Sequence, residues 1–456
     1  MNTKQTIATL RAYESRNVMF TEPDGSWPIV WERAKGVHVW DAEGKKYLDL
    51  TAAFGVAAAG HANPAVVRAG QKQMAKLLHA MGDVHPHALK AQLARELSQI
   101  TFERWTKNSR STPHSSRTGK VIFGSSGFEA VEAALKTAML ATGKRGIIAF
   151  EGAYHGLGYG ALNATHREHF RAPFRNQLRD FGNFLPFPVA ADVSRRKSSA
   201  ISEREQLRRL SSAATKIFKR EKIGAILVEP IQARGGCNVP PKEFLPLLRK
   251  LCDEFGALLI LDEIYTGFGR TGNWFACEHS GVVPDLICLG KALTGGFPLS
   301  ACVGRADIMD AAWPASTGEA IHTSTFLGHP VGCAMALAQI AEIKKLRLCG
   351  RSATLGKFLA TELDPLHTPH SALRISSRGR GLMFGVELTL PNGQPATQIA
   401  LDAIKKLLHR GYIFLPEGEH GNVISSTPPL TITQAQLKKS VAALAIVLAE
   451  ARSGQF

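Results

Sequence analysis

Lys291 and Asp262 occupy positions in this 456-residue chain where each could take part in chemistry. Lys291 follows the apolar run 285–289 and precedes a loop containing two adjacent glycines. Desolvation at the end of a buried strand lowers the pKa of a lysine and makes its amine nucleophilic toward an aldehyde. Asp262 ends the apolar run 257–262, where a carboxylate is costly unless it meets a cation. That cation would be a protonated pyridine nitrogen or a nearby arginine.

Two further loops carry candidate binding residues. The turn Gly124-Ser125-Ser126-Gly127 separates an apolar run from an amphipathic helix, and the N–H groups and dipole of such a helix start suit a phosphate. An ordinary N-cap uses the same residue types. Tyr154 follows another apolar run and could stack on a planar ring. Its neighbour His155 is, taken alone, typical of a structural hydrogen-bond partner.

Two other motifs receive no functional assignment. The segment 267–272 fits the pattern G-x-G-x-x-G, but no convincing helix of small residues follows it. No strand-ending acid lies about 20 residues further on, as a dinucleotide site requires. The pattern His-x-x-His at 166–169 is a weak metal signal within a basic stretch, and no metal is assigned.

The elements that must position these residues indicate an α/β fold. Short, continuous apolar runs recur between 120 and 304 with helical segments between several of them, which predicts a largely parallel sheet flanked by helices. Further helices are expected at about 64–82 and 330–347. We expect a large domain over 64–335, and a smaller α+β domain built from 336–456 together with the N-terminal segment 1–63.

Composition limits the class of protein. No apolar run reaches 18 residues, so no membrane span is expected, and the N-terminus lacks the apolar core of a signal peptide. Seven cysteines without a closely spaced pair favour reduced thiols in the cytoplasm. The net charge of +17 gathers in 107–120 and 191–222, which favours solvated surface over a nucleic-acid site because neither segment matches a base-reading motif.

The order of motifs resembles that of the class III, fold-type I, pyridoxal-phosphate aminotransferases, over about 30–450. This group includes ornithine, acetylornithine, 4-aminobutyrate and ω-amino transaminases. The matching segments are GVHVWDAEGKKYLDL, GHANPAVV, GSSGFEAVEAALKTA, AYHG, VEPIQARGG, LILDEIYTGFGRTG, LGKALTGGFPLSA and TSTFLGHP.

The resemblance implies a role for each site residue. Lys291 would hold pyridoxal 5'-phosphate as a Schiff base and then move the substrate proton, and Asp262 would keep the ring nitrogen protonated. Tyr154 would stack on the ring, and Thr325 would reach the phosphate of the neighbouring subunit of a homodimer. The remaining expected cofactor-binding residues are Ser125, Ser126, Gly127 and Phe128 at the phosphate, with His155, Glu229 and Tyr265 around the ring.

The departures from the family lie where the substrate would bind. Many members pair a glutamate with an arginine that binds the substrate carboxylate; here Arg234 stands at the first position and Ser425 at the second. One hypothesis is that Arg234 now binds the carboxylate; the other is that the donor is an amine or diamine without one. The usual Asn of a Gly-Asn-Pro segment is also replaced, by His329.

The leading functional prediction is therefore a transaminase that moves a terminal or ω-amino group to a 2-oxo acid by ping-pong half-reactions. The alternative is an aminomutase, decarboxylase or lyase that uses the same cofactor. A nucleic-acid binder or a non-enzyme is motivated only by the net charge.

Overall fold

The computed structural model describes residues 1–22, 25–108, 117–190, 201–368 and 372–452. The two basic segments named above, 107–120 and 191–222, therefore lie partly outside the described residues. Among the helices that are described, none combines the length and the apolar character needed to cross a bilayer.

A seven-stranded sheet forms the centre of the molecule, in the order β4-β10-β9-β8-β7-β5-β6. Strand β10 runs antiparallel to both of its neighbours, and the other pairs are parallel. The predicted α/β fold is confirmed, although the short edge strand β6 was not expected. The strands are β4 (Gly119–Gly124), β5 (Gly146–Phe150), β6 (Gly182–Leu185), β7 (Ile223–Val228), β8 (Leu258–Asp262), β9 (Leu286–Leu289) and β10 (Ser300–Arg305).

Successive strand residues point to opposite sides of the sheet. Both faces of this sheet therefore carry apolar side chains, and helices cover both. In β5, Ile147 and Ala149 pack with the alanine-rich face of α6, whereas Ile148 and Phe150 pack with α10 on the other side. Continuous apolar strands are the expected result. The helices around the sheet are α3 (Pro64–Lys76), α4 (Ala88–Ile100), α5 (Phe102–Asn108), α6 (Gly127–Thr142), α7 (Tyr159–Leu162), α8 (Glu168–Arg171), α9 (Glu203–Arg220), α10 (Phe244–Phe255), α11 (Ala306–Ala312) and α12 (Pro330–Lys345).

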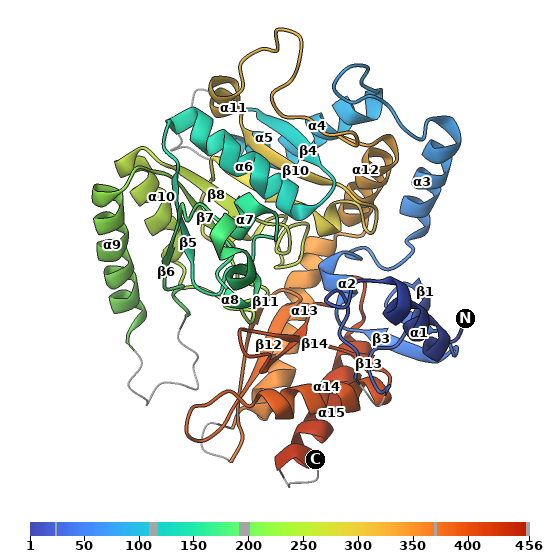
Figure 1. The fold of residues 1–456 in the computed structure, drawn as a ribbon. Helices are drawn as coiled ribbons and strands as arrows, with labels where there is room; N and C mark the ends of the chain where they lie inside the picture. The colour runs from blue at the N-terminus through green and yellow to red at the C-terminus, as the bar shows by residue number, and fades with distance from the viewer. Residues whose placement is uncertain (23–24, 109–116, 191–200, 369–371, 453–456) are drawn as a thin grey trace.

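The two ends of the chain meet beside this central body, as the blue and red segments of Figure 1 show. Strand β3 pairs in parallel with β13 to complete the sheet β1-β2-β3-β13. A second small sheet has the order β11-β12-β15-β14. The domain limits at 63 and 335 stay a prediction.

The elements of these two end segments are as follows. The N-terminal ones are α1 (Thr3–Tyr13), β1 (Trp31–Lys35), β2 (His38–Asp41), β3 (Lys46–Asp49) and α2 (Ala52–Gly55). The C-terminal ones are α13 (Leu348–Leu363), β11 (Arg374–Arg380), β12 (Met383–Thr389), α14 (Thr397–His409), β13 (Tyr412–Ile413), β14 (Leu415–Glu417), β15 (Val423–Ser426) and α15 (Gln434–Arg452).

Candidate active site

A cavity of about 380 Å³ lies where the loops after β4, β5, β7, β8 and β9 converge. Ligands of open α/β sheets bind at this edge. The structure brings most of the predicted site residues into its wall. The lining residues are Gly127, Phe128, Tyr154, His155, Gly156, Leu157, Glu229, Ala233, Arg234, Asp262, Ile264, Tyr265 and Lys291.

Lys291 is the nucleophile that the cavity offers. Its backbone has a φ of +41°, a left-handed conformation that is uncommon for a residue with a side chain. The Nζ atom lies 4.5 Å from the centre of the Tyr265 ring. Desolvation lowers the pKa of Lys291, and the charges of Asp262 and Glu229 oppose this shift. The amine is therefore more easily deprotonated than that of a surface lysine.

Asp262 is held in place by His155 and by its own turn. Its Oδ2 atom lies 2.7 Å from Nδ1 of His155, and its Oδ1 accepts the N–H of Ile264 at 3.1 Å. The backbone N–H of His155 in turn donates to Oγ1 of Thr165 at 2.9 Å. The partner of this costly carboxylate in the protein is thus a histidine, and not the arginine that the sequence left open. The Asp262 side chain still forms part of the cavity wall.

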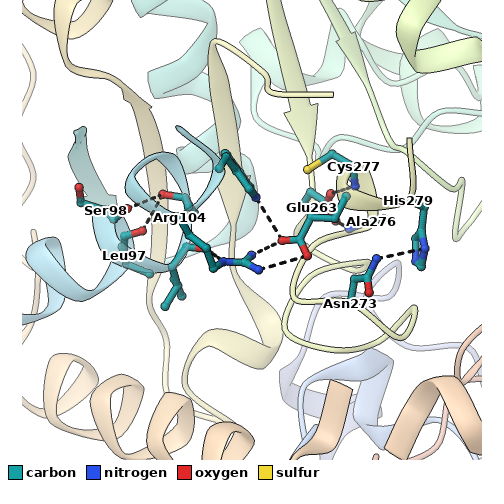
Figure 2. Close-up of polar contacts among 12 residues, drawn as sticks. Leu97, Ser98, Arg104, Glu263, Asn273, Ala276, Cys277 and His279 are labelled. Atoms are coloured by element: carbon teal, nitrogen blue, oxygen red, sulfur yellow. Dashed lines mark hydrogen bonds and ion pairs between the residues drawn. The ribbon is translucent and has the colours of Figure 1, made fainter. Parts of the chain in front are cut away.

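The adjacent acid, Glu263, points away from the cavity. It accepts the N–H groups of Ala276 and Cys277 at 2.9 and 2.8 Å, in the loop shown in Figure 2. Burial raises the pKa of Glu263 to about 7. Of the two neighbouring acids, one therefore faces the site and the other anchors a loop.

The segment 267–272, which mimics a dinucleotide motif, is a turn that joins the two parts of the fold. The Arg270 side chain is buried, and its Nη1 donates to the carbonyl oxygens of Leu382 and Pro428 at 2.9 and 2.6 Å. Both acceptors belong to the C-terminal third of the chain. The glycines serve this turn, since Gly269 and Gly272 have φ values of +92° and +103°.

The start of α6 is arranged to receive an anion. Glu129 accepts the backbone N–H groups of Ser125 and Ser126 at 2.5 and 2.7 Å, so a side chain of the protein already uses these two donors. Gly127 and Phe128 are the residues of the turn that line the cavity. N–H groups in the first turn of a helix lack intrahelical acceptors, and the dipole there favours negative charge.

Glu229 holds two loops of the cavity wall together. Its carboxylate accepts the N–H of Tyr154 at 3.1 Å and that of Ala233 at 3.0 Å. Burial raises its pKa to about 7, with the nearby Asp262 adding to the shift. Both of these contacts are with the backbone, so Glu229 fixes the loop that carries the Tyr154 ring.

Of the two remaining predicted site residues, Tyr265 lies in the cavity wall and Thr325 lies outside it. The Tyr265 hydroxyl lies 3.1 Å from Oγ1 of Thr427, a residue that sequence reasoning missed. Gly55 approaches the Tyr265 ring so closely that a Cβ atom there would lie 2.9 Å from it. Thr325 is exposed and is not part of the cavity wall.

Arg234 enters the cavity beside an acid that sequence reasoning also missed, Glu417. The Arg234 Nε atom lies 3.8 Å from Oε2 of Glu417, and the guanidinium carbon lies 5.1 Å from the centre of the Tyr154 ring. A signal existed in the sequence, because Glu417 follows an apolar run as Asp262 does. Ser425 lies on β15 opposite Leu415 of β14.

These residues together fit pyridoxal phosphate. The cavity offers an amine with a lowered pKa, a buried carboxylate, a tyrosine ring in the wall and the first turn of a helix, where N–H groups lack intrahelical acceptors. Those are the partners required by an aldehyde, a ring nitrogen, an aromatic face and a phosphate. The predicted role of each residue toward this group remains a proposal.

Comparison with known proteins gives one family. The model of the aminotransferase class-III family matches residues 19–448. An acetylornithine aminotransferase of Methanosarcina mazei is 35% identical over 94% of this chain and 93% of its own length. A 5-aminovalerate aminotransferase of Pseudomonas aeruginosa is 35% identical, over 92% and 93%. A putrescine aminotransferase of Pectobacterium atrosepticum is 36% identical, over 90% and 81%.

Solved structures agree with these sequence relatives. The (S)-enantioselective omega-transaminase of Thermomicrobium roseum superposes with a TM-score of 0.85 at 28% identity, covering 99% of each chain. An amine transaminase of an uncultivated Pseudomonas species, in its PLP-bound form, gives 0.84 at 27% identity, covering 96% of this chain and 98% of its own.

Proposed function

Because the chain belongs to the class-III aminotransferases and depends on pyridoxal phosphate, we propose that it moves a terminal or ω-amino group from an amine or amino-acid donor to a 2-oxo acid. The single observation that carries this proposal is the placement of Lys291 and Asp262 in one cavity wall. The substrates in the names of the relatives, which carry amino groups at chain ends, support the ω-amino class.

Bound pyridoxal phosphate supplies a carbonyl carbon that takes an amine and a ring that withdraws electrons. The protein supplies the rest. Lys291 would hold the cofactor, and its amine would take up and return the substrate proton, because its lowered pKa leaves it more readily neutral. Asp262, oriented by His155, would keep a proton on the ring nitrogen. Gly127 and Phe128 would bind the phosphate, and Tyr154 would cover the ring.

Arg234 would bind the carboxylate of the 2-oxo acid. Among the described residues that line the cavity, Arg234 is the only arginine and Lys291 is the only lysine. A guanidinium matches a carboxylate with two parallel N–H donors. Arg234 would thus replace the arginine whose place Ser425 takes.

The active form would be a homodimer in which Thr325 reaches the phosphate of the partner subunit. The structure leaves a set of large apolar side chains exposed near this threonine, at the end of α3 and along the segment after it, and a single chain rarely exposes so many together. The exposed residues are Met74, Leu77, Leu78, Met81, Val84 and Phe326. A second copy of the chain would cover them.

A reducing compartment such as the cytoplasm would suit the enzyme. All seven cysteines are unpaired, and six of them are buried. Disulfides are rare in the cytoplasm, where thiols are kept reduced.

A single-turnover spectrum of the purified holoenzyme tests the proposed function. The protein is mixed with a panel of amines, diamines and ω-amino acids, without any 2-oxo acid. Conversion of the cofactor to its pyridoxamine form by one class of donor is the expected result. If the spectrum is perturbed, the cofactor returns unchanged and product accumulates, then the enzyme is an aminomutase, decarboxylase or lyase and the proposal is wrong.

A further inference from the structure

Glu417 is a buried acid, and the residues around it compensate its charge only in part. Its side chain is 3% exposed, and it ends strand β14 beside the cavity residue Arg234. The 3.8 Å between Glu417 Oε2 and Arg234 Nε exceeds a hydrogen-bond distance. Both atoms are buried, and neither has a hydrogen-bond partner among the described residues. A buried charged group in this condition needs another donor.

The backbone keeps these two residues side by side. The N–H of Gly418, which follows Glu417, donates to the carbonyl oxygen of Arg234 at 3.0 Å. The side chains are held less tightly than the backbones, because Arg234 is 30% exposed and reaches over the Tyr154 ring. Arg234 can therefore turn away from Glu417, within the cavity that it already lines, while Glu417 stays in place.

Glu417 also lies within electrostatic reach of the reactive amine. Burial raises the pKa of Glu417 to about 7, while the positive charges of Arg234, Lys291 and Arg167 oppose the shift. The negative charge of Glu417 raises the pKa of Lys291, as the charge of Asp262 does. A donor whose reacting amino group is held at the cofactor beside Lys291 would thus have a carboxylate nearby for a second cation.

We propose that Glu417 selects the amino donor by binding the distal ammonium group of a diamine or diamino acid, while Arg234 turns to the carboxylate of the 2-oxo acid. This inference rests on the proposed transaminase function. One pair of opposite charges would then serve both halves of the ping-pong cycle. The cationic donor would bind to Glu417, and the anionic acceptor would bind to Arg234.

A comparison of two donors that share a four-carbon chain, with and without a second amino group, tests this proposal. The holoenzyme is given 1,4-diaminobutane or butylamine, and kcat/KM is measured for each with wild type, Glu417→Gln and the control Glu419→Gln. The side chain of Glu419 is exposed two residues further on. We expect the diamine-to-monoamine ratio to fall by about 10- to 100-fold in Glu417→Gln, which corresponds to one hydrogen bond to a charged group. The control keeps the wild-type ratio.

Two results would overturn the proposal. An unchanged ratio in a folded Glu417→Gln variant would do so, above all if the KM for the 2-oxo acid rose instead, since Glu417 would then only hold Arg234. If the variant does not fold, the wild-type ratio decides, and a value near one excludes a site for the second ammonium group.

A binding measurement separates this proposal from the proposed function. The pyridoxamine-phosphate form of the protein does not react with amines, so calorimetry reports affinity without turnover. Tighter binding of 1,4-diaminobutane than of butylamine, lost in Glu417→Gln, is the expected result. Failure of every amine to convert the cofactor would refute transamination, whereas equal affinity for the two amines would refute the role of Glu417 alone.

Discussion

Replacing Asp262 by asparagine removes one negative charge from the active site and changes almost nothing in size. In the structure, Asp262 Oδ1 accepts the N–H of Ile264, and an asparagine oxygen can keep this bond. The other oxygen faces Nδ1 of His155 at 2.7 Å, and an amide nitrogen there would force His155 to accept a hydrogen bond. The variant should fold, because burial of a neutral amide costs less than burial of a carboxylate.

The size of the effect follows from the charge that is lost. At an ordinary hydrogen-bond distance of about 3 Å from a protonated ring nitrogen, the Asp262 carboxylate would contribute about 5–6 kcal/mol at an effective dielectric constant of about 20. A neutral hydrogen bond retained by asparagine returns about 1 kcal/mol. At about 1.4 kcal/mol for each factor of ten, the half-reaction with an amine should slow by about 10³- to 10⁴-fold.

Stopped-flow absorbance of the holoenzyme mixed with an amine donor measures this rate. Cofactor content and thermal unfolding are measured on the same samples, to exclude loss of cofactor or fold. Glu263→Gln is the matched control, because Glu263 is the next residue, is equally buried, and faces the loop of Figure 2 instead of the cavity. The control should lose stability and keep its rate within about tenfold. A rate for Asp262→Asn within tenfold of wild type, with full cofactor content, would refute the assignment.

Three further predictions concern the substrate, pH and assembly. Arg234→Ala should raise the KM for a 2-oxo acid by about 10- to 100-fold and leave KM for an aldehyde acceptor nearly unchanged; equal effects on both acceptors would contradict carboxylate binding. The folded-state pKa of Glu417, about 7, lies above its ordinary value of 4.5, so its contribution to stability is present below about pH 4.5 and is lost as pH rises toward 7. Glu417→Gln should therefore gain thermal stability relative to wild type between pH 5 and pH 7.5, and a parallel pH dependence would argue against this burial. Met81→Asp should shift the sedimentation coefficient toward that of a monomer, whereas an intact dimer would place the interface elsewhere.

The sequence predicted the central sheet and most of the cavity wall because both depend on local pattern. A buried parallel strand is a continuous apolar run, and the residue after it lies at the ligand edge of the sheet. Lys291, Asp262 and Tyr154 were placed by this rule, whereas Glu229 was expected only from the resemblance. The resemblance to a family then related them to one cofactor.

The contacts that depend on distant segments could not be predicted in this way. Glu417 meets Arg234, and Thr427 meets Tyr265, only because the C-terminal strands fold against the central body. To predict His155 as the partner of Asp262, one would have had to know how the ends of β5 and β8 are aligned in the sheet. His329 shows a substitution that structure explains, since its Nδ1 accepts the N–H of Val331 and caps α12 as the usual asparagine could.

The expected helix over 64–82 was too long, since α3 ends at Lys76 and the segment beyond it exposes apolar side chains. The spacing of apolar residues still favours a helix in this segment. We attribute their apolar character to burial against a partner subunit and not to burial within this chain. Patterns of burial in an assembly and within one chain look alike in a sequence.

The pairing of β3 with β13 has a consequence for how the chain is made. Leu48 lies beside Tyr412, so these two strands meet across 363 residues of intervening chain. At a synthesis rate of about 5–20 residues per second, strand β3 waits roughly 20–70 s for its partner. During that interval the hairpin of β1, β2 and β3 presents an unpaired edge, the kind of surface that invites pairing with another chain. We therefore expect nascent chains that stall before β13 to aggregate or to recruit chaperones, while the central body, whose strands lie between 119 and 305, can already be folded.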